Sequence, residues 1–223
     1  STAAGRADAI AQIQDQSGGV LDGLVPCAGL SGLPNRPGSL LVSLNYFGTI
    51  ELLEGLRENL AQAEAPAAVA ISSNSTTTVP PGMVSAEVIE ACLAGDEERA
   101  RALADETGSL PAYPTTKPAI AWWVRRHAPT AEWIGEGINL NAIAPGKTET
   151  AMVAEGRADP VIGPHMDAFP LPIGRDGRPE EIASLLTFLL GPEARFFCGS
   201  LIFCDGGTDA AANPDIQPTP TIK

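Results

Sequence analysis

Short apolar runs alternate with helical segments along most of this chain, and this alternation restricts the folds open to it. Runs that are apolar, brief and bounded by glycine or turn residues are typical of strands buried on both faces of a sheet. Such runs occupy residues 19–29, 66–74, 137–146 and 199–207. Segments with a helical pattern alternate with them, at residues 1–16, 40–63, 112–127 and 178–193. Strands that alternate with helices form a parallel sheet with helices on both faces, so the order predicts an α/β fold.

Two segments interrupt the alternation. Residues 75–110 form a polar, acidic stretch, which predicts an inserted helix or pair of helices. Residues 147–176 are rich in glycine and proline and follow the carboxyl end of a strand, where open α/β sheets bind ligands. We expect a mobile substrate lid there. The chain as a whole is expected to form one domain over residues 1–207, followed by a proline-containing flexible tail over residues 208–223.

Charge and cysteine usage narrow the class of partner. The chain has 14 basic and 27 acidic residues, a formal charge of −13, which repels nucleic acid and anionic membranes and favours a small-molecule ligand. Its four cysteines form no CxxC pair and its two histidines stand apart, so we expect neither a disulfide framework nor a metal site. No apolar run approaches the roughly 20 residues of a membrane-spanning helix. These features predict a cytoplasmic protein.

The stretch "PAYPTTKPAIAWW", residues 111–123, carries a possible catalytic pair. Tyr113 and Lys117 are four residues apart, which places them on one face of the expected helix. A neighbouring cation favours phenolate and lowers the pKa of a phenol from about 10. Such a phenol can exchange a proton with a substrate oxygen near neutral pH. The alternative is a surface tyrosine stacked on a lysine stem.

Other polar residues occupy strand ends and a helix interior, positions at which a functional role would explain them. Residues 72–74, in "ISSNS", follow a buried strand and would emerge at the ligand-binding edge of the sheet, although a serine pair there can also cap a helix. Asn45 falls inside the long helix 40–63, where asparagine is a poor helix former, although an exposed asparagine would need no explanation. "NAIAPG" ends the third strand in a turn at Pro145 and Gly146.

Taken together, these residues resemble the short-chain dehydrogenase/reductase family. The matching motifs occur in the family's order: "PCAG" (26–29), "SLNYFG" with Asn45, "ISSNS" with Ser73, the Tyr113 and Lys117 pair, "NAIAPGKTET" (141–150) and "DGG" (205–207). The resemblance implies a Rossmann-like, doubly wound, three-layer α/β/α sheet. It also implies NAD(P)-dependent interconversion of a secondary alcohol and a ketone, with hydroxysteroids or other bulky carbonyl compounds as substrates.

The resemblance assigns a role to each catalytic position. Tyr113 would be the general acid and base at the substrate oxygen, and Lys117 would lower its pKa and bind the nicotinamide ribose. Ser73 would hold the substrate oxygen, and Asn45 would anchor a water that links Lys117 to solvent. Cofactor contacts beyond Tyr113 and Lys117 would come from Ala28, Gly29, Pro145, Gly146, Thr148 and Thr150. The expected cofactor is NAD, with NADP left open.

Two departures from the family pattern stand out. Cys27 replaces an asparagine that braces the sheet interior, and we expect a small buried thiol there. No glycine-rich turn follows a strand, so roughly 50 residues of the family's first βαβ unit have no counterpart. The strand at 19–29 would then be an uncovered apolar edge. We therefore expect a fragment of a complete enzyme, with a natural short form as the alternative.

Two further functions remain open at this point. A noncatalytic relic that acts as an assembly partner is one, because the pyrophosphate has no evident site. A serine hydrolase is the other, although "SSNS" is no GxSxG elbow and neither His127 nor His165 has a clear partner. By resemblance, we expect a homodimer or homotetramer formed through the helices 40–63 and 112–127 or through residues 178–207, with the insertion 75–110 selecting between these surfaces.

Overall fold

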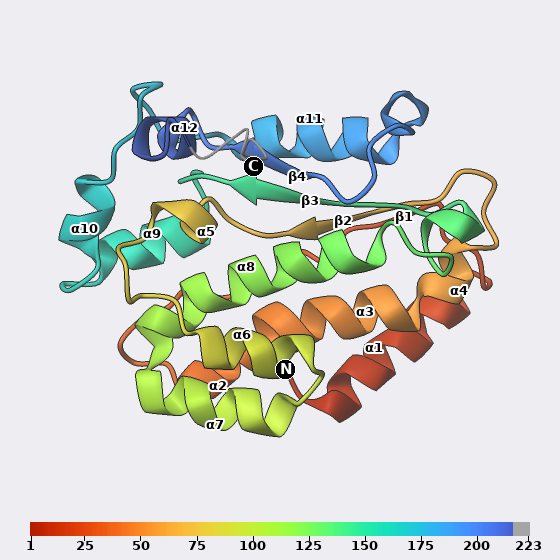
Figure 1. The fold of residues 1–223 in the computed structure, drawn as a ribbon, viewed down its shortest axis with the longest axis horizontal. Coiled ribbons are helices and arrows are strands. Elements are labelled where there is room, and N and C mark those ends of the chain that lie inside the picture. Colours follow the sequence, from red (N-terminus) through yellow and green to blue (C-terminus); the bar gives the residue numbers. More distant parts are fainter. Residues whose placement is uncertain (216–223) are drawn as a thin grey trace, which may run out of the picture.

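Four parallel strands form a single sheet at the centre of the computed structural model, which describes residues 1–215. Their order is β1-β2-β3-β4, so strands that are consecutive in the chain are neighbours in the sheet (Figure 1). The bounds are Gly23–Leu24 for β1, Ala67–Ile71 for β2, Asn139–Pro145 for β3 and Leu201–Cys204 for β4. In the register, Ile71 lies opposite Ile143, and Pro145 opposite Cys204. The predicted parallel sheet is confirmed.

Helices cover both faces of the sheet. One face carries α8 (Ser109–His127), and below it in Figure 1 lie α1 (Ala3–Gln16) and α3 (Gly48–Gly55). The other face carries α11 (Pro179–Leu190), which begins with a proline suited to a helix start. Most of α8 is apolar or small and buried, which lets it pack closely on the sheet. This three-layer arrangement confirms the expected Rossmann-like fold.

The helix expected over residues 40–63 is instead four consecutive helical pieces. They are α2 (Gly38–Leu41), a π-helix η1 (Val42–Phe47), α3 and α4 (Arg57–Leu60). The π-helix contains Asn45, which the sequence pattern marked as out of place in a regular helix. Short π-helical segments inside α-helices are frequently found at functional sites.

The inserted segment is helical, as expected. It forms α5 (Ser75–Thr78), α6 (Ala86–Leu93) and α7 (Glu97–Thr107). Helices α6 and α7 pack on α2, η1 and α8, so they cover part of the layer that α3 and α8 form. Residues 147–176 contain α9 (Ala151–Ala158) and α10 (Gly163–Asp167). The remaining elements are two short 3₁₀ turns, η2 (Ile134–Glu136) and η3 (Pro192–Ala194).

Three predictions need correction: the length of the first strand, the burial of Cys27 and the structure of the C-terminal segment. The strand predicted for 19–29 is reduced to the two residues of β1, which lies at the edge of the sheet and has a partner on one side only within residues 1–215. Cys27 is exposed rather than buried, because nothing described packs outside this edge. The segment expected to be a flexible tail begins with the helix α12 (Thr208–Ala212), and Thr208 is buried. Residues 216–223 lie outside the described residues.

Candidate active site

The carboxyl end of β2 delivers one serine to the edge of the sheet. Beyond Ile71, the backbone continues to pair with β3: Ser72 N donates to the carbonyl of Ile143, and Asn74 N donates to the carbonyl of Pro145. The Ser72 hydroxyl is used internally, because it donates to the Lys117 carbonyl at 2.9 Å. Ser73 is the serine whose hydroxyl forms a hydrogen bond with Tyr113.

Helix α8 brings Tyr113 and Lys117 together, as their spacing predicts. The Lys117 Nζ lies 5.4 Å from the centre of the Tyr113 ring and donates to the Ile71 carbonyl at 3.2 Å. The bond to Ile71 connects the helix to the end of β2. Lys117 is only 7% exposed, so its ammonium is held inside the protein rather than along its surface. The reading of this pair as a surface stack is therefore wrong.

Burial shifts the pKa values of both groups. It lowers the pKa of Lys117 to about 8. It raises the pKa of Tyr113, and the hydrogen bond to Ser73 acts in the opposite direction without reversing the shift. We expected the lysine cation to lower the pKa of the phenol, and this expectation is wrong for the chain without ligand, because desolvation of the phenolate dominates. At neutral pH, Tyr113 is therefore a protonated phenol next to a mostly charged lysine.

Asn45 connects the π-helix to the segment after β1. Its side-chain oxygen accepts from Leu30 N at 2.9 Å, and its amide nitrogen donates to the Leu30 carbonyl at 2.9 Å. The residue is 1% exposed, so the reading as an ordinary exposed asparagine is wrong. Gly29 lies directly before this pairing, and a Cβ there would stand 3.2 Å from the Asn45 oxygen. Ala28 is exposed beside it.

The turn after β3 lies against the end of β4. Gly146 N donates to the Cys204 carbonyl at 3.1 Å, and a Cβ on Gly146 would come within 2.7 Å of the Asp205 Cα, so only glycine fits. The Thr148 hydroxyl donates to the Gly146 carbonyl at 3.1 Å. Thr150 is exposed and caps α9, accepting from Val153 N. Beside this turn is a small cavity of about 100 Å³, which Gly146, Thr148 and Cys204 help to line.

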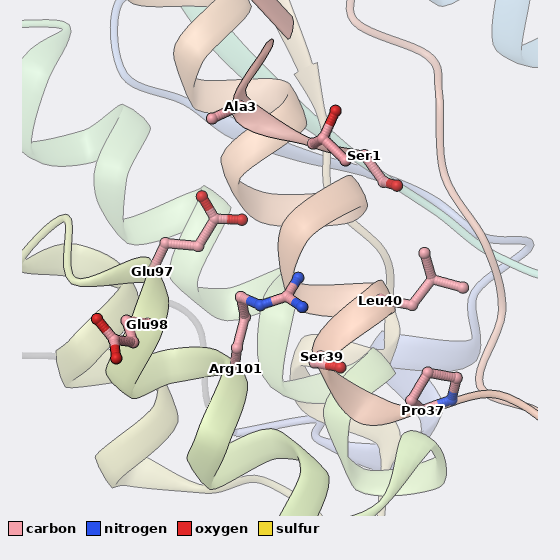
Figure 2. Close-up of a pocket in the computed structure, with 9 residues that line it drawn as sticks. Ser1, Ala3, Pro37, Ser39, Leu40, Glu97, Glu98 and Arg101 are labelled. Carbon is pink, nitrogen blue, oxygen red and sulfur yellow. The ribbon is translucent and has the colours of Figure 1, made fainter. Parts of the chain in front are cut away.

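The candidate catalytic residues Ser73, Tyr113 and Lys117 therefore lie together at the carboxyl end of β2, whereas Asn45 pairs with the segment after β1. A hollow of about 680 Å³ lies elsewhere, among the starts of α1, α2 and α7. Figure 2 shows Glu97 and Arg101 reaching toward it from α7. None of the residues around it comes from a strand end, so it does not belong to the candidate site.

Sequence reasoning missed two parts of this region. The pairing of Asn45 with the Leu30 backbone had a signal, the asparagine inside a helix, but its partner could not be read from spacing. An ion cluster of Lys147, Arg157 and Asp176, in which only Lys147 and Asp176 are buried, had no signal, because its members are scattered through residues 147–176. Among residues 1–215 no group of acidic, histidine or cysteine side chains could hold a metal ion, and no helix there is long and apolar enough to cross a membrane.

Known proteins with similar sequences define the class. A family model described as enoyl-(acyl carrier protein) reductase matches residues 106–209. The chain is 40% identical to 3-alpha-hydroxysteroid dehydrogenase/carbonyl reductase from Comamonas testosteroni, over 96% of this chain and 82% of that protein. The chain belongs to the short-chain dehydrogenase/reductase family, a family of NAD(P)-dependent oxidoreductases.

Solved structures agree with this assignment. The crystal structure of 3-alpha-hydroxysteroid dehydrogenase from Pseudomonas sp. B-0831 complexed with NADH is 42% identical, with a TM-score of 0.90, over 96% of this chain and 83% of that one. Levodione reductase is 23% identical, with a TM-score of 0.71, over 92% of this chain and 74% of that one. The second likeness concerns the fold alone.

Proposed function

We propose that this chain carries the catalytic site of an NAD-dependent oxidoreductase that interconverts a secondary alcohol and a ketone, with hydroxysteroids or other bulky carbonyl compounds as substrates. The single observation behind this proposal is the joint position of Ser73, Tyr113 and Lys117 at the carboxyl end of β2. The substrate class rests on the names of the two relatives with 40% and 42% identity.

The residues present fit the nicotinamide half of the cofactor. An ammonium has three N–H donors, and Lys117 shows one bond, to Ile71, which leaves donors for ribose hydroxyls. The close-packed turn at Gly146 and Thr148 could receive the nicotinamide amide. Ala28 and Gly29, which follow β1, lie at the same edge of the sheet. Residues 1–215 contain no glycine-rich strand-to-helix turn of the kind that binds a pyrophosphate, so the fit concerns this half alone. When bound, the nicotinamide would supply or accept the hydride.

The protein's own groups would handle the proton. Tyr113, protonated at neutral pH, would donate its proton to the ketone oxygen, and the Lys117 cation would stabilise the phenolate that forms. Ser73 Oγ accepts from Ser75 N at 3.1 Å, so its own O–H can turn toward the substrate oxygen. Asn45 as a water anchor remains a prediction. Its side-chain amide is already paired with Leu30, so a water would need an unused oxygen lone pair.

The test is Tyr113→Phe, with Tyr46→Phe as the matched control. Tyr46 is the chain's other tyrosine, and it packs in the apolar core. Loss of a general acid costs roughly 10²- to 10⁴-fold in turnover, so the Tyr113 variant should lose NADH-dependent ketone reduction by that factor while the control keeps it. NADH affinity, followed by tryptophan quenching, should be nearly unchanged. Wild-type turnover in Tyr113→Phe would refute the proposal.

A second function is favoured by one observation. The edge of β1 has no partner within residues 1–215, and no pyrophosphate turn lies there, which suits a noncatalytic assembly partner. An NADH titration separates the two. Saturable binding, with energy transfer from tryptophan to nicotinamide, supports the oxidoreductase. A monodisperse protein without dinucleotide affinity supports the assembly partner.

We also propose that the chain forms a dimer through α11 and β4. The inserted helices α6 and α7 already pack on η1 and α8, so they occupy much of the alternative surface. On the other side, β4 is a partly exposed edge strand, and nearby Phe196 is fully exposed while Phe188 is 42% exposed. Exposed aromatic side chains around an open strand edge are typical of an interface.

A further inference from the structure

The carboxylate of Asp176 joins two cations that come from different segments of the chain. Its Oδ1 lies 3.4 Å from the Nζ of Lys147, and its Oδ2 lies 2.6 Å from a guanidinium nitrogen of Arg157. The side chains of Lys147 and Asp176 are each 8% exposed, whereas that of Arg157 is 39% exposed. The carboxylate therefore pairs with one buried cation and one partly exposed cation.

Each cation belongs to a different part of the candidate site. Lys147 stands between Gly146 and Thr148, in the turn expected to meet the cofactor, and its Nζ also donates to the Met166 carbonyl in α10 at 2.7 Å. Arg157 lies on α9, the other lid helix. The cluster therefore connects the cofactor turn with both helices of the lid.

The backbone of Asp176 is held beside the turn independently of its side chain. Gly177 N donates to the Lys147 carbonyl at 2.9 Å, and Glu149 N donates to the Gly177 carbonyl at 2.8 Å. These two bonds keep residues 147–149 and 176–177 together as one unit. The side chain of Asp176 thus reaches from this unit to α9. Neither of the two backbone bonds includes a residue of α9.

The far side of α9 is attached through another ion pair. Glu155 accepts from the Arg36 guanidinium at 2.6 Å, and Arg36 lies in the loop between β1 and α2. Glu155 is 46% exposed, and exposed ion pairs contribute little to stability because water and salt screen them. Breaking a buried pair is costly, because it leaves an unpaired charge inside the protein. Each of these two pairs joins α9 to the rest of the protein through one partly exposed and one largely buried side chain, but only the pair at Asp176 continues into the buried contact with Lys147.

We propose that Asp176 is a positioning residue that couples the lid helices to the cofactor turn, so that the turn and the lid open and close as one unit. The functional meaning rests on the proposed oxidoreductase activity, in which the lid covers the substrate. The structural coupling does not depend on activity, and it can be measured on the chain without cofactor.

The experiment is hydrogen–deuterium exchange on the cofactor-free chain, comparing Asp176→Asn with Asp167→Asn. Asp167 is the matched control, because it also contacts Arg157, at 3.3 Å, but is 71% exposed and has no link to Lys147. Asp176→Asn should speed exchange at least about tenfold in both the turn, residues 146–150, and the lid, residues 151–167. Asp167→Asn should leave the turn unchanged. If Asp176→Asn loosens only one of the two segments, or if the variants behave alike, the coupling is refuted.

A second variant keeps the test decisive if Asp176→Asn folds poorly. Lys147→Met removes the other half of the buried pair and should loosen the same two segments. The double variant should be less affected than the two single effects combined, because both remove one interaction. Additive effects would overturn the proposal. If NADH also binds, Asp176→Asn should raise KM for the ketone more than it lowers kcat, and Asp176→Glu should restore part of the loss; a lowered kcat with unchanged KM would contradict a lid role.

Discussion

Because its ammonium is buried, Lys117 should lower the free energy of unfolding of the protein at neutral pH. Its pKa falls from the ordinary value of 10.5 to about 8 because of desolvation, and no carboxylate contributes to the shift. At roughly 1.4 kcal/mol for each pH unit, this difference corresponds to about 3 kcal/mol of unfavourable free energy in the folded state below pH 8. A lysine that served only the fold would not be expected to destabilise the folded state by this amount.

The perturbation is Lys117→Met, which removes the charge and keeps nearly the same length. It also removes the hydrogen bond to the Ile71 carbonyl, which is worth about 1 kcal/mol net. The variant should therefore be more stable than the wild type by about 2 kcal/mol near pH 7. Since the unfolded chain binds this proton more tightly than the folded one, wild-type stability rises between pH 8 and 10.5, and the advantage of the variant should fade across that window.

Urea unfolding followed by tryptophan fluorescence at pH 7 and pH 10 measures the difference. Lys147→Met is a matched control, because Lys147 is also buried but is paired with Asp176, so its loss should destabilise the protein. A Lys117→Met variant that is less stable than the wild type at pH 7 would refute the reasoning. So would an advantage that stays constant up to pH 10.

Two other predictions concern Asn45 and the proposed dimer surface. Asn45→Ala leaves the N–H and carbonyl of Leu30 without their partners, so the free energy of unfolding should fall by about 2 kcal/mol in urea titrations. Asn45→Asp keeps the acceptor but places a buried carboxylate opposite the Leu30 carbonyl, so it should lose more; equal losses would contradict this account. Phe196→Asp should convert a dimer into monomers in sedimentation velocity experiments. Trp122→Gln, on the exposed side of α8, should leave the dimer intact. The reverse outcome would assign the interface to α8.

Sequence patterns predicted the features that depend on short-range spacing. Apolar runs bounded by turns located the four strands, and the interval of four residues placed Tyr113 and Lys117 on one face of α8. The position of Ser73 at a strand end was also predictable, because parallel strands all end at the same edge of the sheet. These patterns place side chains at the right edge, but they do not determine how deeply each one is buried.

The features that sequence patterns failed to predict depend on tertiary neighbours. The pKa of Tyr113 was expected to fall because Lys117 lies beside it, but burial, which spacing does not report, raises it. β1 was expected to be long because its sequence is apolar, but it pairs with β2 over only two residues. The ion cluster around Asp176 joins residues that share no periodicity, so only the folded chain brings them together.

The candidate catalytic groups and the lid are held by different kinds of interaction. Lys117 is bonded to the Ile71 carbonyl, Ser73 to the Ser75 N–H, and Asn45 to both backbone groups of Leu30. The backbone partners in these bonds carry no net charge and do not titrate, so among these side chains only Lys117, with a pKa of about 8, makes the geometry sensitive to pH. The lid is held by ion pairs, of which the outer ones are screened by salt. The site is therefore rigid, whereas the lid above it is held by charges. This arrangement suits the reaction, because proton transfer requires fixed distances whereas substrate entry and release require movement.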